Sequence, residues 1–312
     1  MHAVLNSALP IFALILTGFI CGFFGVFDRT ATDNLNRFAV YLALPSLMFV
    51  AMSRISPGEV KQLGFVGAFV GGFSVCFAVA FAISRIRGRR VANASIEGLD
   101  AGYSNVGFMG IPMCLLVFGP ESAPASIIAT LFTACVLFLF AIVLVEIDLQ
   151  EKETFWRTGA KIVRTLFTSP LFIAPIAGLA VGFSGLTVPA PFISFTTLLG
   201  GAASPAALIC IGLFLAQERV VTRDAASIGI LVSLKLILQP LVTAVLAFYV
   251  FAMPPLWSHS AVILSALPIG SGPFTIAKLY GLEAGVTSGS ILASHIFAVL
   301  TVSLLVGWLA QI

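Results

Sequence analysis

The chain has 312 residues and a net charge of +3, and 59% of its residues are hydrophobic whereas only 9% are charged. A soluble domain carries roughly 25% charged residues, so this composition excludes an ordinary soluble enzyme or binding domain. The basic residues lie in short loops and not in one patch, so no nucleic-acid partner is expected. The sequence therefore predicts an all-α polytopic membrane protein in contact with the lipid bilayer.

A helix needs about 20 apolar residues to cross the hydrocarbon core of a bilayer. On this criterion the chain is predicted to span the membrane ten times. Two of these spans, the fourth and the ninth, are interrupted. The predicted spans are 6–26, 35–53, 63–84, 96–118, 123–147, 167–184, 192–216, 226–252, 259–280 and 286–310.

Lysine and arginine are distributed unequally over the loops, and basic residues favour the cytoplasmic side of a membrane. The loops on one side keep only Arg54 and Lys61. The other loops hold Arg29, Arg37, Arg85, Arg87, Arg89, Arg90, Lys152, Arg157, Lys161, Arg164, Arg219, Arg223 and Lys278. This bias predicts a cell inner or plasma membrane protein with both termini outside.

The two halves of the chain repeat each other at an offset of about 160 residues. The matching pairs include Pro10 and Pro170, Gly18 and Gly178, Pro45 and Pro205, and Pro112 and Pro273. Five spans in each half make the second repeat inverted relative to the first. The predicted organisation is a first five-helix repeat at 1–149, a short cytoplasmic linker at 150–166 and a second repeat at 167–312.

Glycine and proline interrupt the fourth and ninth spans, at 104–114 (SNVGFMGIPMC) and 266–277 (ALPIGSGPFTIA). Lipid cannot hydrogen-bond the backbone groups that such a break frees, so these groups must face protein, solute or water. Paired breaks at corresponding places in two halves are the best sequence signal for the substrate site of a secondary transporter.

In the first break, the side-chain amide of Asn105 lies close in sequence to glycines that let a solute approach the backbone. The residues of this candidate site are Asn105, Gly107, Gly110 and Pro112. The Asn105 amide can donate to a carboxylate, and a half-helix N-terminus would favour an anion. Alternatively, Asn105 only ties the break to a neighbouring helix. The second break has no asparagine, so the backbone and Ser271 would supply the polar contacts among Pro268, Gly270, Ser271, Gly272 and Pro273.

Two ionisable residues inside predicted spans are candidates for a coupling or charge role. Lys235 could attract an anion or change protonation, or it could be a structural lysine bonded to backbone carbonyls freed at Pro240. His295 could carry a proton, or it could simply bond across helices. By contrast, Glu146 and Asp148 at the end of the fifth span are expected to be solvated boundary charges.

No catalytic, nucleotide-binding or metal-binding pattern is present. The chain contains no GxxxxGK[ST] sequence, and its five cysteines form no CxxC pair. We therefore expect no enzyme activity, no metal and no cofactor. A coupling ion, H⁺ or Na⁺, is left open.

At these residues the chain resembles the auxin efflux carrier family, which includes the plant PIN carriers and bacterial relatives described as malonate transporters. The likeness rests on 35–45 (LNRFAVYLALP), 105–112 (NVGFMGIP), 267–274 (LPIGSGPF) and 277–280 (AKLY). It implies ten spans in two inverted repeats, with crossing unwound segments in the fourth and ninth. Spans one, two, six and seven would form a scaffold, often dimeric, and the other six a moving transport domain.

Carried over by position, the resemblance makes Asn105 the residue that meets the substrate carboxylate, and Pro112 and Pro273 the crossover prolines. The third predicted span lacks the acid that belongs to a support site in the plant carriers. The sequence thus predicts an elevator-type carrier of small organic anions, auxin-like or malonate-like, that forms a homodimer through scaffold helices. A sodium-coupled symporter like the bile acid carriers and a non-transporting membrane sensor are the alternatives.

Overall fold

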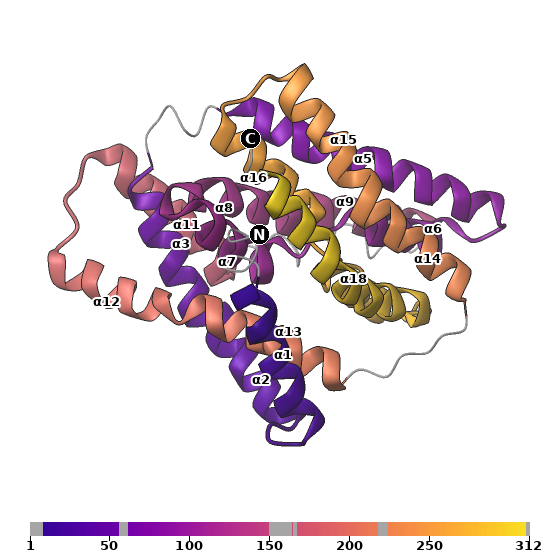
Figure 1. Cartoon of the computed structure of the whole chain (residues 1–312), viewed down its shortest axis with the longest axis horizontal. Helices are drawn as coiled ribbons and strands as arrows, with labels where there is room; N and C mark the ends of the chain where they lie inside the picture. Colours follow the sequence, from indigo (N-terminus) through magenta and orange to yellow (C-terminus); the bar gives the residue numbers. More distant parts are fainter. Residues whose placement is uncertain (1–8, 56–61, 150–163, 165–166, 218–223, 310–312) are drawn as a thin grey trace. The chain divides into compact units, whose positions relative to one another are not determined.

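The computed structural model describes residues 9–55, 62–149, 164, 167–217 and 224–309 (Figure 1). Apolar runs and scarce charges favour helices throughout, because a helix satisfies its own backbone hydrogen bonds in lipid. In the described residues the structure is helical, and its only extended pairing is an isolated bridge between Ser104 and Ile269. The all-helical class predicted from the sequence is confirmed.

The chain forms two compact units, each of which draws on both halves of the sequence. The first unit comprises Met1–Leu63, Gly107–Ile127 and Val163–Glu218, and the second comprises Gly64–Val106, Ile128–Ile162 and Arg219–Ile312. The sequence repeats at 1–149 and 167–312 therefore differ from the units that pack together. The predicted linker at 150–166 lies almost wholly outside the described residues.

In the first unit, two pairs of helices pack closely and reciprocally. Helix α1 packs on α13, and α11 packs on α3, so each of these pairs joins a helix of one half to a helix of the other. The helices of this unit are α1 (Leu9–Phe23), α2 (Arg29–Phe38), η2 (Ala39–Ala43), α3 (Leu44–Ser53), α7 (Ile111–Phe118), η4 (Pro120–Ser122), α11 (Pro170–Ser184), α12 (Ala190–Gly201) and α13 (Ala203–Gln217).

Glycines make this close packing possible, since a side chain there would meet the backbone of the facing helix. A Cβ added at Gly18 would collide with the backbone of Ile209, and one added at Gly178 would lie 2.6 Å from the Phe49 carbonyl oxygen. Gly18 and Gly178 are the glycines matched between the two sequence halves. The repeat thus places a small residue at both reciprocal contacts.

The second unit packs around an aromatic and aliphatic core. Phe73 and Phe77 of α5, Leu99 of α6 and Ile276 of α17 belong to one buried cluster. The helices are α5 (Leu63–Ile86), α6 (Val91–Gly102), η5 (Phe132–Leu137), α9 (Phe138–Leu149), α14 (Ala225–Ser233), η6 (Leu234–Leu238), α15 (Gln239–Val245), η7 (Leu246–Val250), α16 (Pro255–Ala266), α17 (Gly272–Leu279) and α18 (Gly285–Leu309). Three elements contain a boundary between the units, namely α5 after its first residue, η3 (Val106–Gly110) and α8 (Ala123–Leu131).

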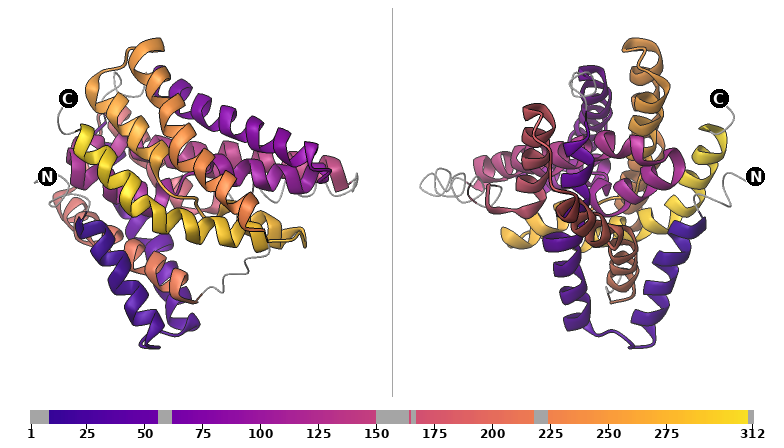
Figure 2. Two further views of the ribbon diagram at one scale, coloured as in Figure 1. Left: turned by 45° about the vertical axis from the view of Figure 1, so that its right-hand side comes forward. Right: turned by 90° about the vertical axis from the view of Figure 1, so that its left-hand side faces the viewer.

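In the part of the chain that the structure describes, six continuous helices are long and apolar enough to cross a membrane. One of them, from α14 to η7, runs unbroken over 26 residues and is drawn in orange in Figure 2. The six are Arg29–Ser53, Leu63–Ile86, Pro120–Leu149, Ala190–Gln217, Ala225–Val250 and Gly285–Leu309, and shorter apolar helices are Leu9–Phe23, Val106–Phe118 and Pro170–Ser184. The span predicted at 35–53 begins earlier, because the Asp28 carboxylate caps a polar first turn by accepting from the Ala31 N–H at 2.7 Å.

Three prolines inside long helices are each preceded by a π-helical turn. The turns η2, η3 and η6 end two residues before Pro45, Pro112 and Pro240. A proline removes one backbone donor and crowds the carbonyl four residues earlier, and a locally wider turn relieves that crowding. These helices therefore continue past the prolines, whereas the true interruptions lie at 103–105 and 267–271.

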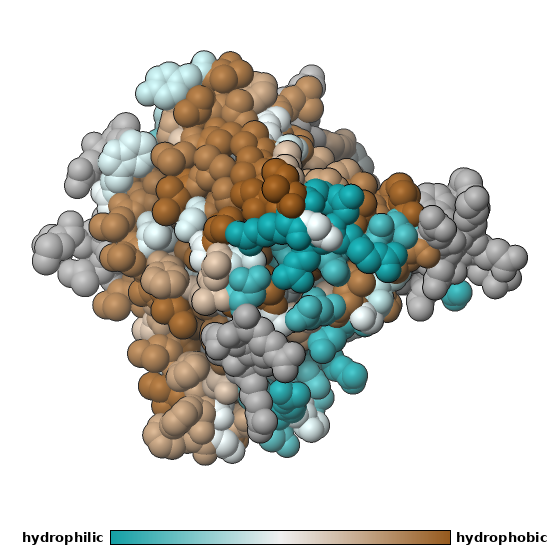
Figure 3. Space-filling view, turned by 90° about the vertical axis from the view of Figure 1, so that its right-hand side faces the viewer, coloured by the Kyte–Doolittle hydropathy of each residue, from teal (hydrophilic) through white to brown (hydrophobic). Residues whose placement is uncertain are grey.

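One end of the second unit is strongly polar. The ends of α5 and the beginnings of α6, α14 and α18 lie at the right of Figure 1, and hydrophilic side chains gather on the face seen from that side (Figure 3). Arg89 pairs with Glu97 at 3.8 Å and with Asp224 at 3.5 Å, and Arg90 pairs with Asp148 at 3.3 Å. Hydrogen bonds from Ser227, with Arg89 nearby, lower the pKa of Asp224.

The helix contact in the first unit gives a stability prediction. In Gly212→Ala, the new methyl group would meet the backbone of Ile15 and Phe19, so α1 must move away from α13 and the apparent melting temperature should fall. Thermal unfolding of purified protein in detergent measures this. Gly229→Ala is the control, because nothing lies within 4 Å of its added Cβ and alanine favours a helix interior. Equal melting temperatures for the two variants would contradict the close contact.

Candidate functional site

The two unwound segments of the second unit cross and pair with each other through their backbones. The Asn105 N–H donates to the Pro268 carbonyl at 2.9 Å, and the Gly270 N–H donates to the Tyr103 carbonyl at 2.9 Å. The Ile269 N–H donates to the Ser294 hydroxyl at 3.0 Å. Backbone groups freed by the breaks are thus satisfied by the opposite break and by α18, as lipid-embedded backbone requires.

Helices α6 and α16 lead into the crossing. Backbone carbonyl groups at or near the ends of both helices accept hydrogen bonds from side chains of one neighbouring helix. The Gln239 amide donates to the Gly102 carbonyl at the end of α6 at 2.9 Å. The Lys235 ammonium donates to the Ser265 carbonyl near the end of α16 at 2.6 Å. Both side chains are fully buried. A cation or amide donor at these positions complements the partial negative charge of a helix C-terminus.

Asn105 meets His295 at the crossing. The Asn105 Nδ2 lies 3.4 Å from His295 Nε2, and His295 Nδ1 lies 2.8 Å from the Ile291 carbonyl oxygen. A carbonyl oxygen only accepts, so this geometry assigns the ring proton to Nδ1 and leaves Nε2 to accept from the Asn105 amide. His295 is 7% exposed, so the histidine is held inside the unit and orients a half-buried asparagine.

The second break leads directly into the N-terminus of α17. Gly270 packs so closely that an added Cβ would lie 3.2 Å from the Tyr103 ring and 3.3 Å from Asn105 Cα. Ser271, the N-cap residue, is exposed and its side chain makes no capping bond. The first amides of α17 have no acceptor within the helix, so this terminus presents donors and a positive dipole end next to Asn105.

The remaining predicted residues of the first break lie on the other side of a unit boundary. Gly107 and Gly110 belong to the turn η3, Pro112 is the second residue of α7, and all three belong to the first unit. Pro273 is likewise the second residue of α17. The two prolines therefore occupy first turns of the second half-helices and lie outside the unwound stretches. Pro268 is the proline within a crossing segment, and its carbonyl accepts from Asn105.

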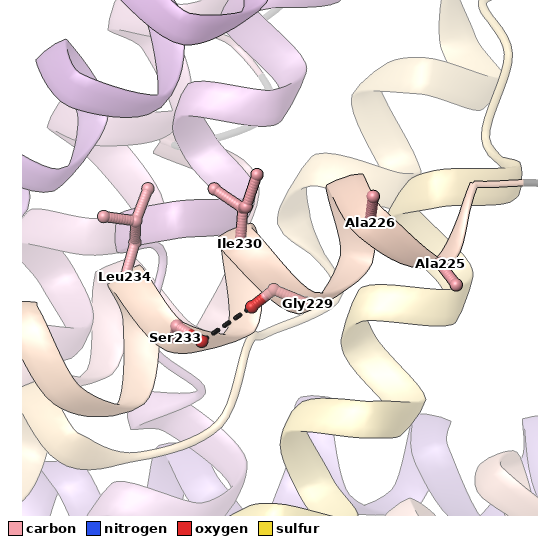
Figure 4. A pocket seen from close by; sticks show the side chains of 6 residues that line it. All are labelled: Ala225, Ala226, Gly229, Ile230, Ser233 and Leu234. Atoms are coloured by element: carbon pink, nitrogen blue, oxygen red, sulfur yellow. Dashed lines mark hydrogen bonds between the residues drawn. The ribbon is translucent and has the colours of Figure 1, made fainter.

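A separate hollow lies along α14, and no charged side chain lines it. It is lined by small or apolar residues, and the Ser233 hydroxyl in it donates to the Gly229 carbonyl of the same helix at 2.7 Å (Figure 4). Ala225, Ala226 and Gly229 in it are exposed. The hollow offers no charged group to a solute, so the crossing remains the candidate site.

Comparison with known proteins identifies the family of this chain. The profile of the membrane transport protein family matches residues 3–306. The chain belongs to this family. A protein of Rhizobium meliloti (strain 1021) named "Putative malonate transporter" is 31% identical over 97% of this chain and 95% of its own length. An uncharacterized transporter of Methanothermobacter thermautotrophicus is 25% identical over 96% of each chain, and one of Methanocaldococcus jannaschii is 22% identical over 98% of each.

The structure of this membrane transport protein also reveals buried polar residues that sequence reasoning missed. Gln239 and Ser294 bind the crossing, and Asp100 is fully buried in α6. The expectation that Glu146 is solvated is wrong, because it is 6% exposed and accepts from the Tyr280 hydroxyl at 2.6 Å. Asp148 is paired with Arg90 and accepts from the Ala92 N–H. An acid within an apolar run was the available signal for Asp100.

The two caps give a prediction about the crossing. Gln239→Leu and Lys235→Met each leave a buried carbonyl without its donor, which costs about 1–3 kcal/mol, so both variants should melt at lower temperature than wild type. Ser233→Ala is the control, since it loses only a hydroxyl bonded within its own helix. Thermal unfolding in detergent measures all three. A Lys235→Met protein that melts like wild type would show that the Ser265 bond does not stabilise the break.

Proposed function

We propose that this protein is a secondary transporter of small organic anions, auxin-like or malonate-like carboxylates, that works by alternating access. The observation that carries the proposal is the position of Asn105 at the crossing, held by His295 and adjacent to the N-terminus of α17. The role is transport, without enzyme activity or a resident cofactor.

A carboxylate fits the donors at this place. One Asn105 amide hydrogen faces His295 Nε2, which leaves the second hydrogen of the same amide for a ligand oxygen. The first-turn amides of α17 and the Ser271 hydroxyl can supply further donors, and the helix dipole favours a negative charge. Hydrogen bonds to a charged group contribute about 1.5–3 kcal/mol each, so two or three of them can hold a small anion.

Reciprocal packing supports ten spans in two inverted five-helix repeats. In the first unit α1 packs on α13 while α11 packs on α3, the arrangement expected when equivalent helices exchange partners across a pseudo-twofold axis. In the second unit the two interrupted helices pair antiparallel at Ser104 and Ile269. Inverted repeats of this kind place the substrate at the crossing, near the middle of the membrane.

The division into units favours an elevator mechanism. The first unit contains α1, α2, α3, α11, α12 and α13, which include the predicted spans one, two, six and seven, and it also contains α7 and η4, which follow the break in the fourth span. We assign the scaffold and the homodimer contact to these helices. The second unit carries Asn105, the caps and α17, and in this mechanism it moves with the bound anion. The small, doubly charged malonate named for the Rhizobium relative is the first substrate to test.

The site makes a binding prediction. Asn105→Ala should lower the affinity for the cognate anion at least about tenfold, because it removes hydrogen bonds to a charged group. Ligand-induced shifts in melting temperature, screened over mono- and dicarboxylates on purified wild type, identify the anion and then measure its affinity.

Asn34→Ala is the matched control, since Asn34 is exposed on α2 in the first unit. A folded Asn105→Ala protein that binds as tightly as wild type would place the site elsewhere. If the protein binds the anion but does not carry it into proteoliposomes, it is a membrane sensor and not a transporter. Uptake that requires sodium would favour the sodium-coupled symporter.

The proposed orientation, with both termini outside, gives a labelling prediction. Ile86 is 85% exposed and Leu186 is 71% exposed, so single cysteines introduced there in a cysteine-free background can react with reagents. We expect the cysteine at position 86 to react from the cytoplasm and the one at 186 from outside, because of the basic residues that surround Ile86. Reaction of both from the opposite sides would reverse the orientation.

A further inference from the structure

Asp100 is a fully buried acid that lies five residues before Asn105 in the chain. Its Oδ2 accepts from the Thr287 hydroxyl of α18 at 2.8 Å. Its Oδ1 is buried and has no hydrogen-bond partner among the described residues. Ser290, one turn after Thr287 on the same buried face of α18, also has a buried hydroxyl without a partner. Burial of an ionised carboxylate with a single hydrogen bond is unfavourable, so this group requires a positive charge or a proton.

The surrounding charged groups do not supply that positive charge. Helix α6 packs against α5, α9, η6, α14, α17 and α18. In the described part of the chain, the titratable or charged residues on or next to these elements bind other groups. Arg89 pairs with Glu97 and Asp224, Arg90 pairs with Asp148, and Arg87 donates to the Ser227 hydroxyl. Carbonyl oxygens accept from Arg85, Lys235 and the Cys76 thiol, and Glu146 accepts from the Tyr280 hydroxyl. His295 contacts Asn105, and Lys278 lies over the Phe274 ring.

A small polar cavity at the charged end of the second unit shares Thr287 with Asp100. Its lining includes Arg89, Asn93, Glu97, Glu283 and Thr287, and its volume is about 20 Å³, enough for one water molecule. Glu283 is exposed, whereas Thr287 is buried and donates to Asp100. Thr287 therefore both lines the cavity and donates its hydroxyl to the carboxyl group of Asp100.

Helix α18 connects Asp100 to the candidate anion site. Thr287 bonds Asp100, Ser294 accepts from the Ile269 N–H at the crossing, and the next residue, His295, meets Asn105. The rise from Thr287 to Ser294 is about 10 Å along one helix. The Thr287 bond is stronger to an ionised Asp100 than to the neutral acid, so a change of charge at Asp100 acts on the crossing through a single rigid element.

We propose that Asp100 is the proton-binding residue that couples a proton to anion transport, an inference that rests on the proposed function. When the site is loaded, the proton is on Oδ1 of Asp100, and the neutral acid removes the buried negative charge. When the cavity opens to water, the Oδ1–H bond breaks, the proton passes to water beside Glu97 and Glu283, and the carboxylate keeps the Thr287 bond on Oδ2. One proton is bound and one is released in each cycle.

The decisive variant is Asp100→Asn, which has the shape of the protonated acid but cannot release a proton. In proteoliposomes with the carboxylate identified by thermal shift, this variant should keep binding and counterflow, since exchange needs no net proton movement. Accumulation driven by a pH gradient should fall to the level of protein-free liposomes. Asp148→Asn, in the same unit, is the matched control, because Asp148 already has the Arg90 guanidinium as partner; it should accumulate like wild type.

A second measurement uses binding and spectroscopy and does not depend on flux. Infrared spectra of wild-type protein should show the band of a protonated carboxylic acid at neutral pH, which disappears in Asp100→Asn and remains in Asp148→Asn. Raising the pH should remove the band in wild type, so this readout holds even if Asp100→Asn folds poorly.

The outcomes separate the two proposals. Wild type without counterflow for any carboxylate would defeat the proposed function, whereas the infrared band would still report the proton on Asp100. Normal pH-driven accumulation by Asp100→Asn, or a wild type without the band, would overturn the proton site. Accumulation driven by a sodium gradient, abolished when choline replaces sodium and lost in Asp100→Asn, would overturn it in favour of a sodium ion.

Discussion

The second unit depends on one constraint, which is that two helices are interrupted where lipid offers no hydrogen bonds. Each free backbone group there would cost free energy if it remained unpaired. Mutual pairing of Tyr103 and Asn105 with Gly270 and Pro268 satisfies the donors and acceptors of both breaks at once. The two breaks are therefore interdependent, because neither can be unwound at low cost without the other.

The caps extend this dependence to a third helix. Lys235 and Gln239 are four residues apart, so their backbones are separated by a rise of about 6 Å, and they reach the ends of α16 and α6. A single continuous helix thus fixes both half-helix ends. The cost of burying an ammonium is offset in part by the Ser265 carbonyl and by the dipole of α16, which accounts for a lysine deep in a span without assigning it to the substrate.

Much of this architecture could be predicted from local sequence, and the remainder could not. The glycine and proline run at 266–277 located the second break, because those residues act through the backbone of their own segment. The first break lies at 103–105, just before the predicted glycine and proline run, whose residues 106–118 are helical. The Gln239–Gly102 cap and the Asp100–Thr287 bond join residues more than 130 positions apart, and the Lys235–Ser265 cap joins residues 30 positions apart. No periodicity or spacing encodes such pairs. Pro112 illustrates a limit of another kind, since the π-helical turn before it lets the helix continue through a residue that normally ends one.

Charge balance connects the proposed anion site with the proposed proton site. A monocarboxylate brings one negative charge into the second unit, and a proton on Asp100 removes one. The loaded unit then carries the same net charge as the empty unit with an ionised Asp100, so movement through the membrane adds no electrostatic penalty for the substrate. A dicarboxylate brings a second negative charge, which a single proton on Asp100 does not remove. Transport of a monocarboxylate with one proton should consequently be insensitive to membrane potential, whereas a fully ionised dicarboxylate should respond to it.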